Sequence, residues 1–137
     1  MAHKNLRSRG LKTTKPRIKI LKILENAKKH HLTAEQVYKE LLDTGDDVGL
    51  ATVYRVLTQF EASGLVRRHN FEGGRSVFEV DDGEHHDHLV CLHCNCVEEF
   101  VDDVIEERQY LIAKKAKFKM TDHSLTIYGL CSDCNDA

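Results

Sequence analysis

Apolar residues recur every three to four positions along the first part of the chain, which is the period of amphipathic helices. Pro16 suits a first helical position, and Thr33 followed by Gln36 has the spacing of a capping box that starts a helix. Gly64 is placed to end the last of these segments. The pattern therefore predicts four helices, over residues 3–9, 16–27, 33–42 and 50–63.

Strands are predicted where this helical period stops. Residues 65–68 and 76–80 lie on either side of Gly73 and Gly74 and predict a hairpin. Three helices and a hairpin describe a winged helix-turn-helix, in which the third helix enters the major groove of DNA, although other small α+β units share this order. The later part of the chain predicts strands at 87–91, 97–101 and 124–130, and a helix at 102–117. The predicted fold class is α+β.

Charge divides the chain near residue 80. Residues 1–78 hold 15 Lys and Arg against 8 Asp and Glu, whereas residues 79–137 hold 5 against 14, although the net charge is only −2. This division predicts a basic domain at 1–80 that meets a polyanion, an acidic linker at 81–84, and an acidic domain at 85–137 that meets cations. Two solvated surfaces of opposite sign are the alternative interpretation.

The N-terminal residues contain no apolar run, so they do not resemble a secretory signal, and no stretch approaches the length of a membrane span. We therefore expect a soluble, cytoplasmic protein with no membrane partner. The chain has 5 cysteines. In a reducing compartment these favour metal binding or redox chemistry over disulfides.

Two Cys-x-x-Cys pairs, Cys91 with Cys94 and Cys131 with Cys134, predict a metal site. Each spacing lets both sulfurs of a pair reach one ion, and two pairs complete the tetrahedral thiolate site that zinc prefers. Four thiolates leave no open position for catalysis, so the zinc would be structural. Four buried or redox-active thiols are the alternative. Cys96 is unpaired, and we expect it to be a small buried or surface residue.

The run of residues 85–88 contains three histidines and an aspartate, all donors to a borderline divalent metal. In an extended segment, His86 and His88 would point to one face and His85 and Asp87 to the other, which predicts two separate sites. A helix or coil would merge them into one. Each site needs further ligands, and the candidates elsewhere in the chain are His30, His31, Glu79, Glu106 and His123.

Along nearly its whole length the chain resembles the ferric uptake regulator family. The matching segments are His30-His31, GLATVYRVLTQF at 49–60, RHNFEGGRSVFEV at 68–80, HHDHLVCLHC at 85–94, IEERQ at 105–109 and HSLTIYGLC at 123–131. The resemblance implies a winged-helix DNA-binding domain, a hinge and a C-terminal α/β dimerisation domain. It also implies a repressor of iron-uptake genes that binds AT-rich palindromic operators as a homodimer when loaded with Fe(II).

The resemblance also assigns the metal ligands. A regulatory iron site that joins the two domains falls on His31, Glu79, His86 and His88. An additional site falls on His85, Asp87, Glu106 and His123, and the structural Zn(II) site falls on Cys91, Cys94, Cys131 and Cys134. Members of this family that sense zinc tend to place a thiolate in the regulatory site, and those that sense peroxide an aspartate near the hinge. The resemblance therefore favours an iron sensor, because this chain has Glu79 and no cysteine there. Nitrogen and oxygen ligands also accept Mn(II), Co(II) or Zn(II).

The helix predicted at 50–63 would be the recognition helix. Thr52, Tyr54 and Arg55 begin it and are expected to reach bases or nearby phosphates, and Lys15 and Arg17 should meet the backbone or the minor groove. The alternative is that each is an ordinary surface residue or, for Tyr54, a core aromatic.

A redox enzyme and a metal-storage protein are the two alternatives to a repressor. A redox enzyme using a Cys-x-x-Cys pair lacks the expected thioredoxin-like surroundings, and a metal-storage protein leaves the winged-helix pattern unexplained. No nucleophile–base arrangement suggests hydrolysis, so we predict no enzymatic activity. The sequence does not decide between a dimer and a tetramer.

Overall fold

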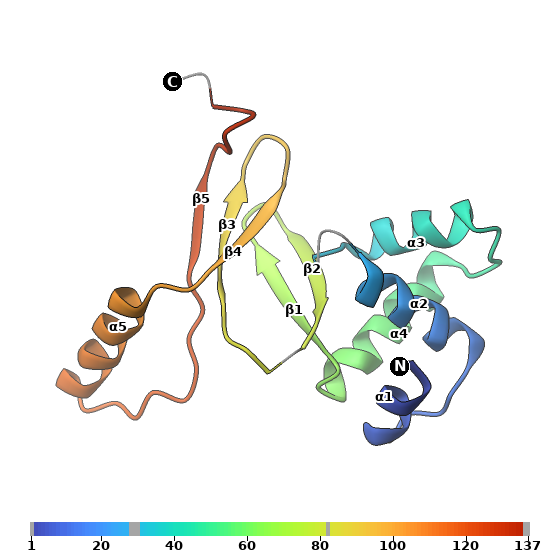
Figure 1. Ribbon diagram of the computed structural model, residues 1–137, viewed down its shortest axis with the longest axis horizontal. Helices are drawn as coiled ribbons and strands as arrows, with labels where there is room; N and C mark the ends of the chain where they lie inside the picture. The colour runs from blue at the N-terminus through green and yellow to red at the C-terminus, as the bar shows by residue number, and fades with distance from the viewer. Residues whose placement is uncertain (1, 28–30, 82, 136–137) are drawn as a thin grey trace. The chain divides into compact units, whose positions relative to one another are not determined.

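The computed structural model of the protein describes residues 2–27, 31–81 and 83–135. The chain divides into two compact units, residues 1–83 and 84–137, each with its own sheet (Figure 1). His30, one of the candidate ligands, and residue 82 of the predicted linker lie outside the described residues. No helix among the described residues is both long and apolar enough to span a membrane.

The first unit begins with the helices that the sequence predicts. They are α1 (Ala2–Ser8), α2 (Lys15–Asn26), α3 (Ala34–Asp43) and α4 (Leu50–Ala62). Pro16 lies in the first turn of α2, and the capping box of α3 is complete, because Thr33 and Gln36 each accept a hydrogen bond from the other's backbone N–H. Gly64 follows α4 with a φ of 77°, a left-handed conformation that glycine adopts at little cost.

A hairpin follows α4. Its strands, β1 (Val66–Phe71) and β2 (Arg75–Val80), pair antiparallel and are longer than the predicted segments, because Phe71 is buried and extends the pairing toward the turn. Leu32 adds a single bridge on the other edge of β2. It exchanges two backbone hydrogen bonds with Phe78, of 3.1 and 2.7 Å. Strand β2 is therefore paired on both edges near Phe78, with β1 on one side and Leu32 on the other.

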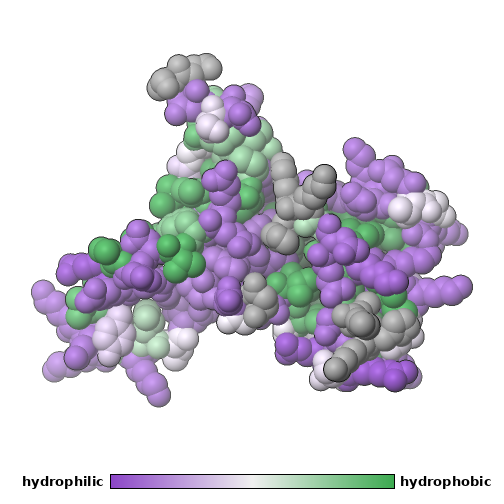
Figure 2. Space-filling view, in the orientation of Figure 1, coloured by the Kyte–Doolittle hydropathy of each residue, from purple (hydrophilic) through white to green (hydrophobic). Residues whose placement is uncertain are grey.

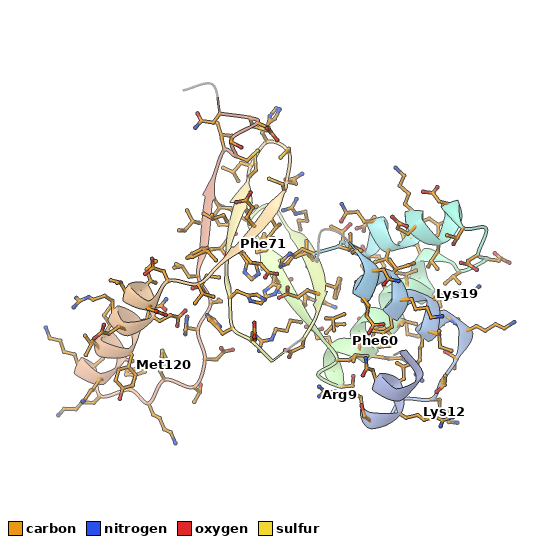
Figure 3. All side chains as sticks on the ribbon, in the orientation of Figure 1. Arg9, Lys12, Lys19, Phe60, Phe71 and Met120 are labelled. Carbon is orange, nitrogen blue, oxygen red and sulfur yellow. The ribbon has the colours of Figure 1, made fainter. Side chains whose placement is uncertain are left out.

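One apolar core holds the helices and hairpin of this unit together. Fully buried side chains come from every helix and from both strands, and they include Leu6, Leu21, Leu41, Leu57, Phe60, Val66 and Phe78. Phe60 points from α4 into this core (Figure 3). Three helices packed beneath a hairpin form the predicted winged helix-turn-helix, with α4 in the position of the recognition helix.

The second unit is built on a three-stranded sheet in the order β4–β3–β5. The strands are β3 (Asp87–Cys91), β4 (Val97–Phe100) and β5 (Thr126–Gly129), and the helix α5 (Asp103–Lys115) lies between β4 and β5 in the chain. β3 is central, antiparallel to β4 and parallel to β5. The two units together confirm the predicted α+β class.

Helix α5 buries none of its side chains within the described part of the chain. Most of its large apolar residues are exposed, and so are neighbours before and after the helix: Val101, Val104, Tyr110, Leu111, Ile112 and Phe118. Apolar side chains also gather over the sheet of this unit (Figure 2), where Leu89, Ile127 and Leu130 are exposed. An exposed apolar area of this kind is typical of a protein–protein interface.

Candidate metal centres and nucleic-acid interface

A buried carboxylate flanked by two imidazoles lies in the first unit. Nε2 of His31 lies 3.0 Å from one oxygen of Glu79, and Nε2 of His69 lies 2.6 Å from the other. The Leu32–Phe78 bridge places His31 opposite Glu79, and the register of β1 and β2 places His69 diagonally across from it on the same face. One ligand atom from each of these three residues lies within 4.8 Å of the others.

Glu79 is charged in this setting. Burial by itself would raise the pKa of the carboxyl group, but hydrogen bonds from His31 and His69, and the charges of those imidazoles, outweigh burial and hold the pKa well below its usual range. The carboxylate therefore needs positive partners. A divalent cation bound by these residues would satisfy the same need, so the cluster is chemically suited to hold one.

His86 and His88 lie together in the second unit. Their ring centroids are 6.2 Å apart, and Nε2 of His86 is 3.3 Å from a carboxylate oxygen of Glu99. The β3–β4 register pairs His88 with Glu99, which places that carboxylate on the same face as both imidazoles. Two imidazoles and a carboxylate on one face again make a donor set suited to a borderline divalent metal.

The opposite face of β3 carries a second donor set. Ligand atoms of His85, Asp87, Glu106 and His123 all lie within 4.8 Å of one another. His85 is 3.1 Å from Asp87 and 3.4 Å from Glu106, and His123 is 3.0 Å from the second oxygen of Glu106. Oδ2 of Asp87 is buried and has no hydrogen-bond partner among the described residues. A buried carboxylate oxygen without a hydrogen-bond partner is well suited to bind a cation.

Thiols gather at the far end of the same sheet. The sulfurs of Cys91, Cys94, Cys96 and Cys131 all lie within 4.8 Å of one another, and those of Cys94 and Cys131 are 3.7 Å apart. Backbone N–H groups of Cys94 and Cys131 donate to the sulfur of Cys91. These two hydrogen bonds are the main reason that the pKa of Cys91 falls to about 5. A thiolate is the form that zinc binds, so the arrangement fits that metal.

The three residues predicted at the start of the recognition helix differ in exposure. Tyr54 and Arg55 are exposed on α4, and Thr52 is half-buried. The hydroxyl of Tyr54 donates to the carboxylate of Glu35 at the start of α3, which lowers the pKa of Glu35 and raises that of Tyr54. Tyr54 is therefore a surface side chain held by a neighbouring helix, not a core aromatic.

Lys15 and Arg17 lie in the first turn of α2. Lys15 is exposed, whereas the guanidinium of Arg17 donates to the backbone oxygen of Lys12 at 2.9 Å and to the Gln59 side chain at 3.0 Å. Arg17 therefore connects the start of α2 to α4, and its charge stays at the surface.

Three residues near these donor sets were not predicted as ligands. His69 lies in a strand with no donor beside it in sequence, Glu99 lies among other acidic residues, and Cys96 is the odd cysteine. The one sequence signal was the spacing of Cys96 from Cys94. The other two depend on strand register, which sequence patterns leave open.

Comparison with known proteins identifies the chain. Residues 8–128 match the ferric uptake regulator family. The ferric uptake regulation protein of Legionella pneumophila is 69% identical over 129 residues, which cover 94% of this chain and 95% of that protein. Two solved structures are also similar. The Vibrio cholerae ferric uptake regulator matches with a TM-score of 0.89 and 55% identity, over 94% of this chain and 98% of that one.

The ferric uptake regulator from Francisella tularensis, solved with iron, matches with a TM-score of 0.87 and 42% identity, over 91% of this chain and 95% of that one. These matches extend over nearly the whole of both chains, so they include both units of the fold. The chain belongs to the ferric uptake regulator family and is a metal-responsive transcription regulator with an N-terminal DNA-binding domain and a C-terminal dimerisation domain, not an enzyme.

Proposed function

We propose that the protein is a metal-dependent repressor that binds AT-rich palindromic operator DNA as a dimer when it holds Fe(II), and that it controls iron-uptake genes. The observation that carries the proposal is the buried Glu79 carboxylate, with an imidazole at each oxygen, within a winged-helix unit. These donors would bind a divalent cation, and their place beside the hairpin links metal binding to DNA binding.

The regulatory site is proposed to use His31 and Glu79 from the DNA-binding domain and His86 and His88 from the dimerisation domain. Residues 1–80 and 85–137 would be these domains, and 81–84 the hinge. When all four side chains bind one ion, they restrict the orientation of one domain relative to the other. If the metal binds the DNA-binding orientation of the domains about 10⁴-fold more tightly than the other orientations, a difference of about 5.5 kcal/mol, nearly all of the protein would adopt that orientation.

Iron is the proposed regulatory metal. The regulatory ligands offer only nitrogen and oxygen atoms, and the similar protein from Francisella tularensis was solved with iron. Ligands of this kind also bind Mn(II), Co(II) and Zn(II), and intrinsic affinity alone would favour zinc. The in vitro response should therefore extend to these ions, with metal availability deciding which one acts in the cell.

Two further metal sites are proposed in the dimerisation domain. His85, Asp87, Glu106 and His123 would hold an additional divalent ion, because their ligand atoms converge and Oδ2 of Asp87 lacks a partner among the described residues. The second is a structural Zn(II) site, predicted on Cys91, Cys94, Cys131 and Cys134. Zinc bound there would join the end of β3 to the segment after β5 and would stabilise the fold.

DNA recognition is proposed to use α4. Arg55 can donate two hydrogen bonds to a guanine, Tyr54 can pack on a thymine methyl, and Thr52 can reach a base or phosphate. Lys15 and Arg17 would contact the backbone or the minor groove, since both charges lie at the start of α2. The exposure of Lys15, Tyr54 and Arg55 on the winged-helix unit supports these roles.

A homodimer is proposed because a palindrome has two equivalent half-sites. Two recognition helices held about one DNA turn apart would enter successive major grooves. The exposed apolar residues around α5 and over the sheet offer a self-complementary interface. Whether two dimers associate further into a tetramer would depend on the concentration of protein and on metal.

The decisive test is operator binding by the full-length protein under anaerobic conditions. AT-rich palindromic duplexes selected from a random pool would be titrated with protein at fixed Fe(II), Mn(II) or Zn(II), or with no added metal. The variants are His86→Ala and, as a matched control, His93→Ala, whose side chain is exposed between the first two cysteines. We expect binding to need metal, to weaken strongly in His86→Ala and to be unchanged in His93→Ala. Binding that ignores both the metal and the substitution of His86 would refute the repressor mechanism.

A further inference from the structure

All 5 cysteines of the chain lie in the second unit, one more than a structural zinc site requires. Among the described residues, the sulfurs that lie within 4.8 Å of one another belong to Cys91, Cys94, Cys96 and Cys131. Cys96 thus takes the place in this group that the paired spacing predicts for Cys134. Zinc in a structural site binds four ligands, so five nearby thiols cannot all bind at once.

Backbone hydrogen bonds hold Cys96 beside Cys91. The N–H of Cys91 donates to the carbonyl of Cys96 at 3.0 Å, and the N–H of Asn95 donates to the carbonyl of Cys91 at 3.0 Å. Asn95 has a φ of 65°, a left-handed conformation that asparagine tolerates better than most residues and that reverses the chain here. Residues 91–96 therefore form one hydrogen-bonded turn with three sulfurs.

Strand pairing brings the fourth sulfur to this turn. β3 pairs with β5 as far as Cys91 and Gly129, and the N–H of Leu92 donates to the carbonyl of Gly129 at 2.8 Å. The N–H of Cys131 then donates to the sulfur of Cys91 at 3.4 Å. Cys134 comes from the following turn, where its N–H donates to the carbonyl of Cys131 at 3.0 Å.

Cys96 and Cys134 approach the other thiols from different parts of the backbone. The sulfur of Cys96 lies within 4.8 Å of those of Cys91, Cys94 and Cys131. Cys134 follows Cys131 at the Cys-x-x-Cys spacing, in the turn where its N–H donates to the carbonyl of Cys131. Geometry therefore makes Cys96 a candidate for the last position at the metal, and spacing makes Cys134 another.

We propose that Cys91, Cys94 and Cys131 are constant ligands of the zinc and that Cys96 and Cys134 exchange in the fourth position. The inference rests on the proposed structural zinc site. In the exchange, the zinc–sulfur bond to Cys134 breaks as a bond to Cys96 forms, and the proton of the Cys96 thiol passes to Cys134. Charge and coordination number are unchanged, so the segment after Cys131 can detach without release of zinc.

A packing role for Cys96 is the competing explanation. Cys96 borders a hollow that is also lined by Leu89, Ile127 and Leu130, and a buried cysteine often acts as a small apolar side chain. Packing alone predicts that Cys134 is an obligatory ligand and that Cys96 never binds the metal. The two explanations therefore differ in what happens when Cys134 is removed.

Thiol labelling of the zinc-loaded, full-length protein tests the exchange without any substitution. Brief treatment with iodoacetamide would be followed by mass spectrometry of each cysteine-containing peptide and by measurement of bound zinc. We expect singly labelled molecules of two kinds, some modified at Cys96 and some at Cys134, with one zinc retained in both. Labelling confined to Cys96 would overturn the exchange and leave the zinc site intact. Rapid labelling of all five cysteines would overturn the zinc site as well.

Substitutions give an independent readout through zinc affinity, measured by competition with a chelator. Cys96→Ser and Cys134→Ser should each change the affinity by less than about tenfold, whereas the double variant should lose much more than the sum of the two, because neighbouring groups that replace each other are not additive. Cys91→Ser is the control that should lose zinc alone. If Cys134→Ser loses as much affinity as Cys91→Ser while Cys96→Ser behaves as wild type, the exchange is refuted. Cobalt(II) spectra that keep full thiolate intensity in Cys134→Ser would support it.

Discussion

His31 and Glu79 form a buried pair, with Nε2 of the histidine 3.0 Å from Oε2 of the carboxylate and 4% and 5% of the two side chains exposed. The pair depends on one backbone contact, the bridge between Leu32 and Phe78, which places the residues on either side of it opposite each other. The same bridge joins the start of α3 to the hairpin. A change at Glu79 should therefore affect both the fold of the DNA-binding domain and its response to metal.

Replacement of Glu79 by Gln should loosen this part of the first unit. The amide carries no charge to balance the imidazoles, and the loss of charge-assisted hydrogen bonds should cost about 1–3 kcal/mol. Native-state hydrogen exchange of the Phe78 amide, which donates to Leu32, would measure the cost in metal-free protein. Glu61→Gln is the control, because Glu61 pairs with Arg68 near the surface and should contribute at most about 1 kcal/mol. Equal, small effects of both substitutions would contradict the prediction.

His69→Ala should weaken regulatory metal binding without abolishing it. His69 contacts the Glu79 oxygen that His31 does not contact, so removal of His69 would leave the Glu79 carboxylate less well oriented as a ligand. Side chains that orient a metal ligand in this way are worth about 10–100-fold in metal affinity. Isothermal titration of the zinc-loaded protein with Mn(II) would measure the change. His31→Ala should remove the response entirely. A His69→Ala variant with wild-type affinity would show that the imidazole serves only the fold.

Glu106→Gln should remove one metal ion and leave the others. Each oxygen of Glu106 faces an imidazole of the additional site, and an amide is a much poorer ligand than a carboxylate. Elemental analysis after equilibrium dialysis against Mn(II) should report one equivalent less than wild type, with zinc content unchanged. Glu107→Gln on the same helix is the matched control, since Glu107 is exposed. Loss of zinc in Glu106→Gln would point to general unfolding instead.

Arg55→Ala and Lys15→Ala should weaken operator binding in different ways. If Arg55 contacts a base, its loss should cost about 1–3 kcal/mol and relax the sequence preference at one position. If Lys15 contacts a phosphate, its loss should weaken binding to all sequences and reduce the salt dependence by about one unit of slope. Fluorescence anisotropy with operator and scrambled duplexes across a range of salt separates these outcomes. Unchanged operator affinity in Arg55→Ala would refute its role.

Most of the helices and strands were predictable because their signals are local. The complete capping box at Thr33, the proline in the first turn of α2 and the left-handed Gly64 after α4 each depend on a few neighbouring residues. The hairpin was predicted too short, because Phe71 is held in β1 by burial and not by any local pattern. The hydrophobic pattern along a strand indicates which face is buried, but it does not indicate at which residue the pairing with the next strand ends.

The alternation of side chains in strands also explained part of the candidate site. His85 and Asp87 lie on one side of β3, and His86 and His88 on the other, as an extended segment requires, although the strand itself begins only at Asp87. The roles of His69 and Cys96 could not be predicted in this way. His69 meets Glu79 through the register of two strands, and Cys96 meets Cys131 through the parallel pairing of β3 and β5.

By itself the sequence determined the family, the α+β class, the helices and their caps, and the residue types able to bind metal, since these depend on composition and on neighbours along the chain. Only the tertiary structure decided which donors converge. It placed both oxygens of Glu79 against imidazoles and brought the unpaired Cys96 into the sulfur cluster. The physical reason is that convergence depends on strand register and on backbone pairing between distant segments, and a shift of one residue would move each of these side chains to the opposite face.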